Sequence, residues 1–408
     1  MTSEREHQDG LSRRALFAAS SAAAIGALGV HAVAGAQESP TVNFHGKHQS
    51  GITTPPQSYL AFATFDVVST HRQELAGLLV EWGHAARRFM AGLPLQTTYD
   101  GSFPPEDSGE ALGLGAANLT VTFGYGPRLF DQRFGLSKRR PSVLVDLPPF
   151  HGDDLQPEFT GGDLCVQACA DDPQVAFHAV RNLAQLGSGV VSMRSLQFGS
   201  GRTSATGSGQ GSTRNLLGFK DGTNNIRATD APLLKRWVYA DRNDGQPWMG
   251  GGTYLVIRRI RTNLSTWSSI SLDSQERVIG RKRASGAPLT GHHEHDAPKF
   301  AKLDAHGFPV IPLDSHMRVA SPHTNGGLRI LRRGYNYVDG IDQTTGNVEA
   351  GLLFICFQRN PVTQFTALQS DLARSDALSR YITHRGSGVF ACPPGLQQGE
   401  SLGASLFR

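Results

Sequence analysis

The chain has 408 residues, 39% of them hydrophobic and 18% charged, with a formal net charge of +4 at pH 7. This length is typical of about two ordinary domains, and the apolar content suffices for packed cores. A charge this small, without a basic stripe interleaved with aromatic residues, argues against a nucleic-acid-binding protein.

Residues 1–36 are predicted to be a twin-arginine export signal. Ser12-Arg13-Arg14-Ala15-Leu16-Phe17 has the form of the twin-arginine motif, and Ala34-Gly35-Ala36 has that of a cleavage site. A membrane anchor or a disordered basic tail is the alternative. However, the run from Ala15 to Ala36 is rich in Ala, Gly and Ser and is too polar for a membrane span. We therefore expect a folded chain exported to the periplasm, the cell envelope or the medium, with no integral membrane segment after cleavage. Residues 37–56, polar with Gly and Pro, are predicted to be a flexible lead-in.

Residues 57–225 are predicted to form a first domain. Apolar, β-favouring runs indicate strands, and apolar residues at helical spacing indicate helices. The first helix is expected to begin at a capping box, Thr70–Gln73, and the second at Asp172-Pro173. The expected strands are 59–68, 119–123, 164–168 and 190–198. This β-α-β-β-α-β order is that of the ferredoxin-like unit.

Residues 226–408 repeat the order and are predicted to form a second domain. Its expected strands are 254–260, 328–331, 352–357 and 388–391, with helical segments within 266–279 and after Asn360-Pro361. The predicted fold class is therefore α+β, with two ferredoxin-like domains, each a four-stranded antiparallel sheet with helices. The Gly- and Ser-rich stretch 199–212 near the seam is predicted to be a mobile surface loop.

The four cysteines are predicted to be buried free thiols. Cys165 and Cys169 lie in an expected strand, where four residues span roughly 13 Å. A disulfide needs Cα atoms closer than about 7 Å, so this pair should not bridge. Cys356 and Cys392 belong to no CxxC motif.

Three segments carry residues capable of chemistry. Asp221 lies in the glycine-flanked run Gly218–Thr223, and His316 precedes Arg332 by sixteen residues. His292-His293-Glu294-His295 looks like a metal site, although its spacing fits no standard zinc pattern. Taken singly, each segment also has a plain structural interpretation as a turn, a structural histidine, a surface base or a solvated loop.

Together these segments resemble dye-decolourising haem peroxidases. Gly218-Phe219-Lys220-Asp221-Gly222 looks like the GxxDG motif of that family, and His316 and Arg332 stand where it has its proximal haem ligand and distal arginine. The resemblance covers about residues 55–395 and leans toward the branch with the bacterial deferrochelatase/peroxidase of iron uptake. Longer stretches that carry it are Leu119–Leu136, Gly161–Leu186, Ile279–Gly291 and Leu328–Tyr337.

The resemblance implies one haem b per chain, held in the C-terminal domain and facing the domain seam. His316 would be the proximal iron ligand, with Asp371 or Asp376 accepting a hydrogen bond from its other nitrogen. Asp221 and Arg332 would be the distal catalytic residues. The residues implied to line the haem are Gly222, Thr223, Asn224, Ser321, Pro322, His323 and Arg332. His323 replaces the family's usual arginine, which weakens an expected propionate contact, and it is the rival iron ligand. Trp237, Trp248 and Tyr335 are candidates to carry electrons to the surface.

The implied activity is reduction of hydrogen peroxide with oxidation of dyes, phenols or other small or bulky one-electron donors. One alternative is a deferrochelatase that releases iron from haem, leaves the porphyrin intact and works with iron-uptake partner proteins. A second is a secreted haem carrier, which would need neither Asp221 nor Arg332. A third is a zinc protein using His292, His293 and His295. The oligomeric state is left open, with a homo-oligomer among the options.

Overall fold

The structure is a computed structural model that describes residues 39–96, 101–207 and 209–407. The export signal predicted for residues 1–36 lies outside the described residues. Among the described residues, no helix has both the length and the apolar character needed to cross a bilayer.

The first half of the chain has the predicted β-α-β-β-α-β order. Its elements are β1 (Tyr59–Val67), α1 (Arg72–Met90), β2 (Thr120–Tyr125), β3 (Leu164–Ala170), α2 (Pro173–Leu186) and β4 (Val191–Arg202). The strands pair antiparallel in the order β2-β3-β1-β4. Asp172 caps α2 as expected, because its carboxylate accepts from the backbone N–H groups of the first turn. The capping box predicted for α1 is wrong: His71 stands at the N-cap without a side-chain bond, and its N–H donates to Ser69 Oγ at 3.0 Å.

The second half repeats the plan with additions. Its main elements are β5 (Thr253–Thr262), α4 (Leu264–Ser269), α5 (Leu272–Ile279), β7 (Tyr335–Ile341), β8 (Val348–Gln358), α7 (Ala367–Ser375) and β9 (Ile382–Cys392). Shorter elements are α3 (Ala231–Trp237), α6 (His316–Val319), β6 (Leu331–Arg332) and α8 (Ala404–Phe407). The strands pair antiparallel in the order β9-β5-β8-β7, and β6 pairs with β8 as well. The chain is therefore α+β, with an antiparallel ferredoxin-like order in each half.

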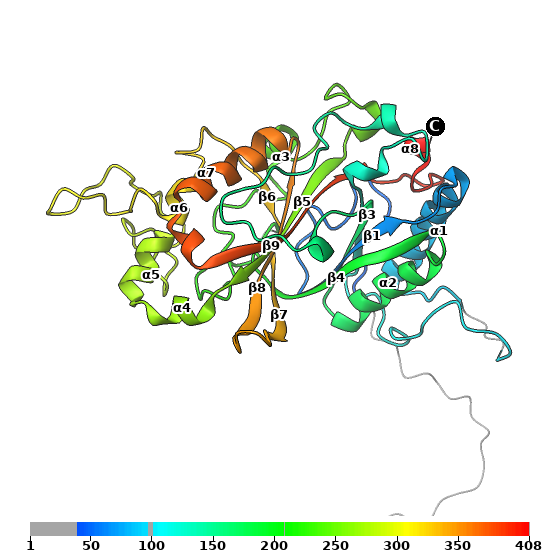
Figure 1. Ribbon diagram of the computed structural model, residues 1–408, viewed down its shortest axis with the longest axis horizontal. Coiled ribbons are helices and arrows are strands. Elements are labelled where there is room, and N and C mark those ends of the chain that lie inside the picture. The colour runs from blue at the N-terminus through cyan, green and yellow to red at the C-terminus, as the bar shows by residue number, and fades with distance from the viewer. Residues whose placement is uncertain (1–38, 97–100, 208, 408) are drawn as a thin grey trace, which may run out of the picture. The chain divides into compact units, whose positions relative to one another are not determined.

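Eight of the strands close into a ring. β2 pairs with β9, β4 pairs with β7, and the β5–β8 pairing completes the circle β5-β9-β2-β3-β1-β4-β7-β8. Successive residues of a strand point to opposite faces. Accordingly, Leu60 and Phe62 of β1 join a core cluster shared with β3, β5, β7, β8 and β9, whereas Ala61 and Phe65 pack with α1 and α2. Figure 1 shows α1 and α2 beside β1, β3 and β4 on the right of the view, and α4 to α7 on the left. The domain boundary predicted between residues 225 and 226 stays a prediction.

Two segments expected to be loose are instead packed. In the predicted lead-in, Ile52 is fully buried, and the carbonyl of Thr54 accepts a hydrogen bond from the buried Arg333 guanidinium. In the predicted mobile loop, residues 203–206 are buried. Burial follows here from contacts with distant segments, which local composition does not reveal.

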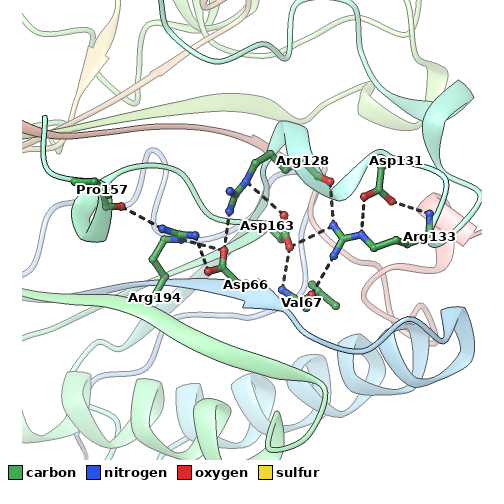
Figure 2. Close-up of polar contacts among 8 residues, drawn as sticks. All are labelled: Asp66, Val67, Arg128, Asp131, Arg133, Pro157, Asp163 and Arg194. Atoms are coloured by element: carbon green, nitrogen blue, oxygen red, sulfur yellow. Dashed lines mark hydrogen bonds and ion pairs between the residues drawn. The ribbon is translucent and has the colours of Figure 1, made fainter.

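A network of arginines and aspartates holds the 126–133 segment against β1 (Figure 2). Arg128 pairs with Asp66 at 2.7 Å, and Arg133 pairs with Asp131 at 2.5 Å. Asp163 Oδ2 accepts from the N–H of Val67 at 2.9 Å. The stretch Leu119–Leu136 carries part of the family resemblance. Its charged residues therefore stabilise the packing of the first half.

All four cysteines are buried and free, as predicted. Cys165 and Cys169 lie in the extended strand β3, consistent with the spacing argument.

Candidate functional site

A cavity of about 500 Å³ opens in the second half of the chain. This volume is within the usual range for small-molecule and cofactor sites. Its walls come from the loop after β4, from β5, β6, β8 and β9, and from α6 and α7. Every residue proposed for the site from the sequence lines it, namely Asp221, Gly222, Thr223, Asn224, His316, Ser321, Pro322, His323 and Arg332.

His316 is the first residue of α6 and is tied to a buried carboxylate. Its Nδ1 lies 2.6 Å from Oδ2 of Asp376, whose side chain is only 3% exposed. Oδ1 of Asp376 accepts from the N–H of Leu378 at 2.9 Å, so both oxygens are fixed. Asp371, the other candidate acceptor, pairs with Arg374 instead. The Nε2 of His316 makes no hydrogen bond within the described part of the chain and is available to a ligand.

Asp376 also favours the protonated form of His316. Burial by itself would lower the pKa of His316, but the neighbouring carboxylate of Asp376 outweighs it and raises that pKa. A histidine held by a carboxylate in this way is a typical metal-ligand arrangement, because the partner fixes the ring and makes the free nitrogen more basic.

Asp221 and Arg332 form an ion pair in the same cavity. Arg332 Nη1 donates to Asp221 Oδ1 at 2.6 Å, and the side chains are 27% and 17% exposed, respectively. The N–H of Gly222 donates to the same carboxylate oxygen at 2.7 Å. Both also interact electrostatically with His316. A carboxylate and a permanent cation, partly shielded from water, can move a proton and stabilise a developing negative charge.

Gly222 is required by the turn that presents Asp221. Its φ is +81°, and a Cβ there would lie 2.8 Å from Cα of Ser204. Side-chain-bearing residues rarely adopt this conformation, and the contact is with rigid backbone. The turn that carries Asp221 therefore packs directly against the backbone of the buried 203–206 segment.

The histidine-rich segment 292–295 does not form a metal site. His292 and His293 are exposed, and their backbone N–H groups donate to Asp296 at 2.7 and 2.9 Å. Within residues 39–96, 101–207 and 209–407, no group of three His, Cys, Asp or Glu side chains could hold a metal ion. The zinc interpretation therefore has no geometric support.

Glu294 of the same segment instead anchors the cavity wall to the Asp221 turn. Its carboxylate lies 2.6 Å from Nζ of Lys220 and accepts from Thr223 Oγ1 at 3.0 Å. Burial opposes ionisation, but Lys220 and the hydroxyls of Ser212 and Thr223 together lower the pKa of Glu294 to about 2.

Glu294→Gln is expected to cost stability in a pH-dependent way. The pKa of Glu294 in the folded chain is below its ordinary value of 4.5, so its ionised form stabilises the fold above that pH, and the stabilisation fades as pH falls toward 2. We expect the variant to lose about 1–2 kcal/mol of unfolding free energy at pH 7 and to converge with the parent near pH 2. Denaturant unfolding at pH 7, 4 and 2.5 measures this, with the exposed Glu158→Gln as control. A deficit that is the same at every pH would contradict the assignment.

The cavity fits the haem that the family resemblance implies. A planar, mostly apolar ring with two carboxylates needs apolar walls, an axial ligand and cations. The apolar wall residues include Ile260, Phe354, Phe365, Leu368, Leu372 and Ile382. Arg281 and Arg329 are cations that line the cavity, and His316 supplies a free ring nitrogen.

A second polar cluster in the cavity wall escaped the sequence analysis. Arg258 of β5 is 1% exposed and pairs with Asp153, which lies 3.6 Å from Nδ1 of His384 on β9. Burial, and to a smaller extent the positive charge of Arg258, lower the pKa of His384 to about 3. Its imidazole is therefore neutral at ordinary pH. The three residues come from sequence positions more than a hundred residues apart, which gave no local signal.

Two of the three candidate electron-transfer residues are buried. Trp248 is 7% exposed and Tyr335 is fully buried. Trp237 is half-buried, with the Arg236 guanidinium 4.7 Å from its ring centre.

Comparison with known proteins gives one consistent answer. The model of the Dyp-type peroxidase N-terminal region matches residues 49–199, and that of the C-terminal region matches residues 212–397. The chain is 36% identical over 359 residues to a deferrochelatase of Yersinia pestis, covering 86% of this chain and 81% of the relative. It is 38% identical over 371 residues to a dye-decolorizing peroxidase of Thermobifida fusca, covering 88% and 84%, respectively.

Solved structures agree. Ferric DtpA from Streptomyces lividans superposes with a TM-score of 0.83 at 40% identity, covering 90% of this chain and 97% of that one. A DyP-type peroxidase from Streptomyces coelicolor gives a TM-score of 0.84 at 40% identity, covering 91% and 98%, respectively. With both regional models matched and relatives above one-third identity over most of both lengths, the chain belongs to the Dyp-type peroxidase family, whose members are haem-dependent oxidoreductases.

Proposed function

We propose that the chain is a secreted haem b peroxidase that reduces hydrogen peroxide and oxidises dyes, phenols or other one-electron donors. The observation that carries the proposal is that one cavity contains both the His316–Asp376 pair and the Asp221–Arg332 pair. A haem carrier would need the first pair and have no use for the second.

His316 is the proposed ligand of the haem iron, one haem b per chain. Asp376 holds Nδ1, which directs Nε2 toward the cofactor. Gly222, Thr223, Asn224, Ser321, Pro322 and His323 are proposed to line the porphyrin. When bound, haem supplies the redox-active iron at which the peroxide O–O bond is cleaved.

Asp221 is the proposed proton carrier. Its carboxylate accepts a proton from one oxygen of hydrogen peroxide and returns it to the other, which leaves as water. Arg332 cannot lose its own charge and stabilises the negative charge that develops on the departing oxygen. Two electrons and two protons per peroxide yield two waters, and one-electron donors supply those electrons singly.

A deferrochelatase activity is the second candidate, favoured by relatives at 35–36% identity that bear this name. Such an activity would take iron from haem and leave the porphyrin intact, beside iron-uptake partner proteins. Incubation with haem and a ferrous chelator, while metal-free porphyrin fluorescence is followed, distinguishes it from peroxidase turnover.

Export by the twin-arginine route, to the periplasm, cell envelope or medium, is proposed from Arg13 and Arg14. Replacement of both by lysine is expected to retain the chain in the cytoplasm. Cell fractionation with an antibody to the chain reports the outcome.

The test of the main proposal is the absorption spectrum of the haem-loaded chain before and after one equivalent of hydrogen peroxide. A Soret band that shifts within seconds and recovers with a reducing dye supports a peroxidase. A Soret band that ignores peroxide favours iron release or haem carriage, and failure to take up haem overturns the proposal.

A further inference from the structure

Asn225 lies just beyond the GxxDG turn and makes an unusual set of bonds. Its side chain is buried, with 8% of the residue exposed. Oδ1 accepts from the N–H of Arg332 at 2.8 Å, and Nδ2 donates to the carbonyl of Arg332 at 2.9 Å. One side-chain amide therefore satisfies both backbone groups of Arg332, as a neighbouring strand would.

This amide occupies a sheet edge that no strand in the described part of the chain covers. β6 has two residues and, among the strands of residues 39–96, 101–207 and 209–407, pairs with β8 alone, where Arg332 lies opposite Cys356. The N–H of Arg333 donates to the carbonyl of Ile355 on β8 at 2.7 Å, so the backbone groups of Arg332 point the other way, toward Asn225. Sheet pairing fixes one side of this short strand, and the Asn225 side chain fixes the other.

Asn225 is also joined to the turn that carries Asp221. Its N–H donates to the carbonyl of Gly222 at 3.1 Å, and Nδ2 also lies 3.2 Å from the carbonyl of Ala205. The turn that carries Asp221 and the backbone of Arg332 are thus connected through one buried residue, in addition to the direct 2.6 Å ion pair between the Asp221 carboxylate and the Arg332 guanidinium.

We propose that Asn225 is a positioning residue that sets the alignment of Arg332 with Asp221 over the peroxide-binding side of the cavity. The inference rests on the proposed function for the roles of that pair. Loss of the amide frees the outer edge of β6, so the guanidinium is displaced from its place beside the carboxylate. A displacement of about 1 Å in a catalytic group can cost on the order of a hundredfold in rate.

The test compares Asn225→Ala with a matched control, Asn182→Ala. Asn182 is fully buried in α2 and does not line the cavity. Its amide likewise bonds backbone groups: Oδ1 accepts from Ser108 N at 3.0 Å and Nδ2 donates to His178 O at 2.9 Å. Both variants lose a buried amide, but only one loses a contact with Arg332.

Three measurements are made on each variant. Hydrogen exchange of the haem-free chain, read on peptides spanning Leu328–Tyr335, reports the Arg332 N–H bond directly. Cyanide affinity of the ferric haem-loaded chain reports stabilisation of an anion by Arg332 without turnover. The second-order rate constant with hydrogen peroxide, alongside KM for a reducing dye, reports catalysis.

For Asn225→Ala we expect faster exchange in that peptide, cyanide binding weakened about tenfold, and a peroxide rate constant lowered roughly ten- to a hundredfold at unchanged haem content and dye KM. Asn182→Ala should lower the melting temperature and leave these readings at parent values. Asn225→Ala with parent cyanide affinity and peroxide rate, or equal losses in Asn182→Ala, would overturn the proposal. A parent chain that ignores peroxide would instead count against the proposed function, and the exchange and cyanide results would still decide the role of Asn225.

Discussion

His316→Ala is expected to abolish the normal haem spectrum of the chain. Nε2 of His316 is the free nitrogen of an imidazole whose other side is held by Asp376 at 2.6 Å, and alanine removes the whole arrangement. Haem content should fall to a small fraction of the parent value, and any haem retained should show a displaced Soret band. Pyridine haemochrome assay and absorption spectra of the purified variant measure both quantities.

His323 gives the sharpest comparison, because it lines the same cavity and is the rival ligand. His323→Ala should keep the parent Soret position even where haem binds less tightly. The exposed His306→Ala, on a loop outside the cavity lining, should match the parent in both respects. Loss of the axial-ligand spectrum in the His323 variant, with His316→Ala unaffected, would reverse the assignment.

Asp221→Asn is expected to slow the reaction with hydrogen peroxide by about 10²–10⁴-fold, the usual contribution of a positioned acid–base group. Asparagine preserves the size of the side chain and can still accept bonds from Gly222 and Arg332, which reach the aspartate at 2.7 and 2.6 Å, respectively. It cannot take up and return a proton. Stopped-flow mixing of the ferric chain with peroxide, under pseudo-first-order conditions, yields the rate constant directly.

Two further variants separate the contribution of proton transfer from that of charge stabilisation. Arg332→Leu removes the cation and leaves the carboxylate, so its effect on the same rate constant measures the second contribution. Asp371→Asn alters a half-buried helix aspartate outside the cavity lining that pairs with Arg374, and it should behave like the parent. A parent-like rate in Asp221→Asn, together with a large loss in Arg332→Leu, would transfer the central role to the arginine.

The sequence predicted those parts of the fold whose residues form apolar runs or repeat at helical spacing. β1, β3 and the amphipathic α1 and α2 were accessible in this way, because each buries a continuous apolar face. β7 was not predicted, since Tyr335–Ile341 mixes aromatic residues with Asn, Asp and Gly and is mostly exposed at its end. β9 was predicted too short, because its first half, residues 382–387, is mostly polar and includes His384, which lines the cavity and contacts Asp153.

The site was accessible mainly through the motif resemblance. Nothing in the local pattern distinguishes Asp376 from Asp371, because the sequence places both on the last predicted helix and the choice depends on where that helix ends. α7 ends at Ser375, which places Asp376 in extended backbone facing His316. Asn225 was invisible for a similar reason: its neighbour Asn224 has the same side chain, and only the tertiary structure shows which amide meets Arg332.

The closed ring of strands has a consequence for how the chain acquires its cofactor. Its last member, β9, comes from residues 382–392, yet it pairs with β2 and β5, and its His384 lines the cavity with Asp376 just before it. During synthesis, the N-terminal strands leave the ribosome first and can assemble early. The circle and the pocket within the second half are incomplete until residues 382–392 have emerged. Products truncated or stalled before β9 should therefore be unable to retain haem, so that cofactor capture requires β9 to be in place.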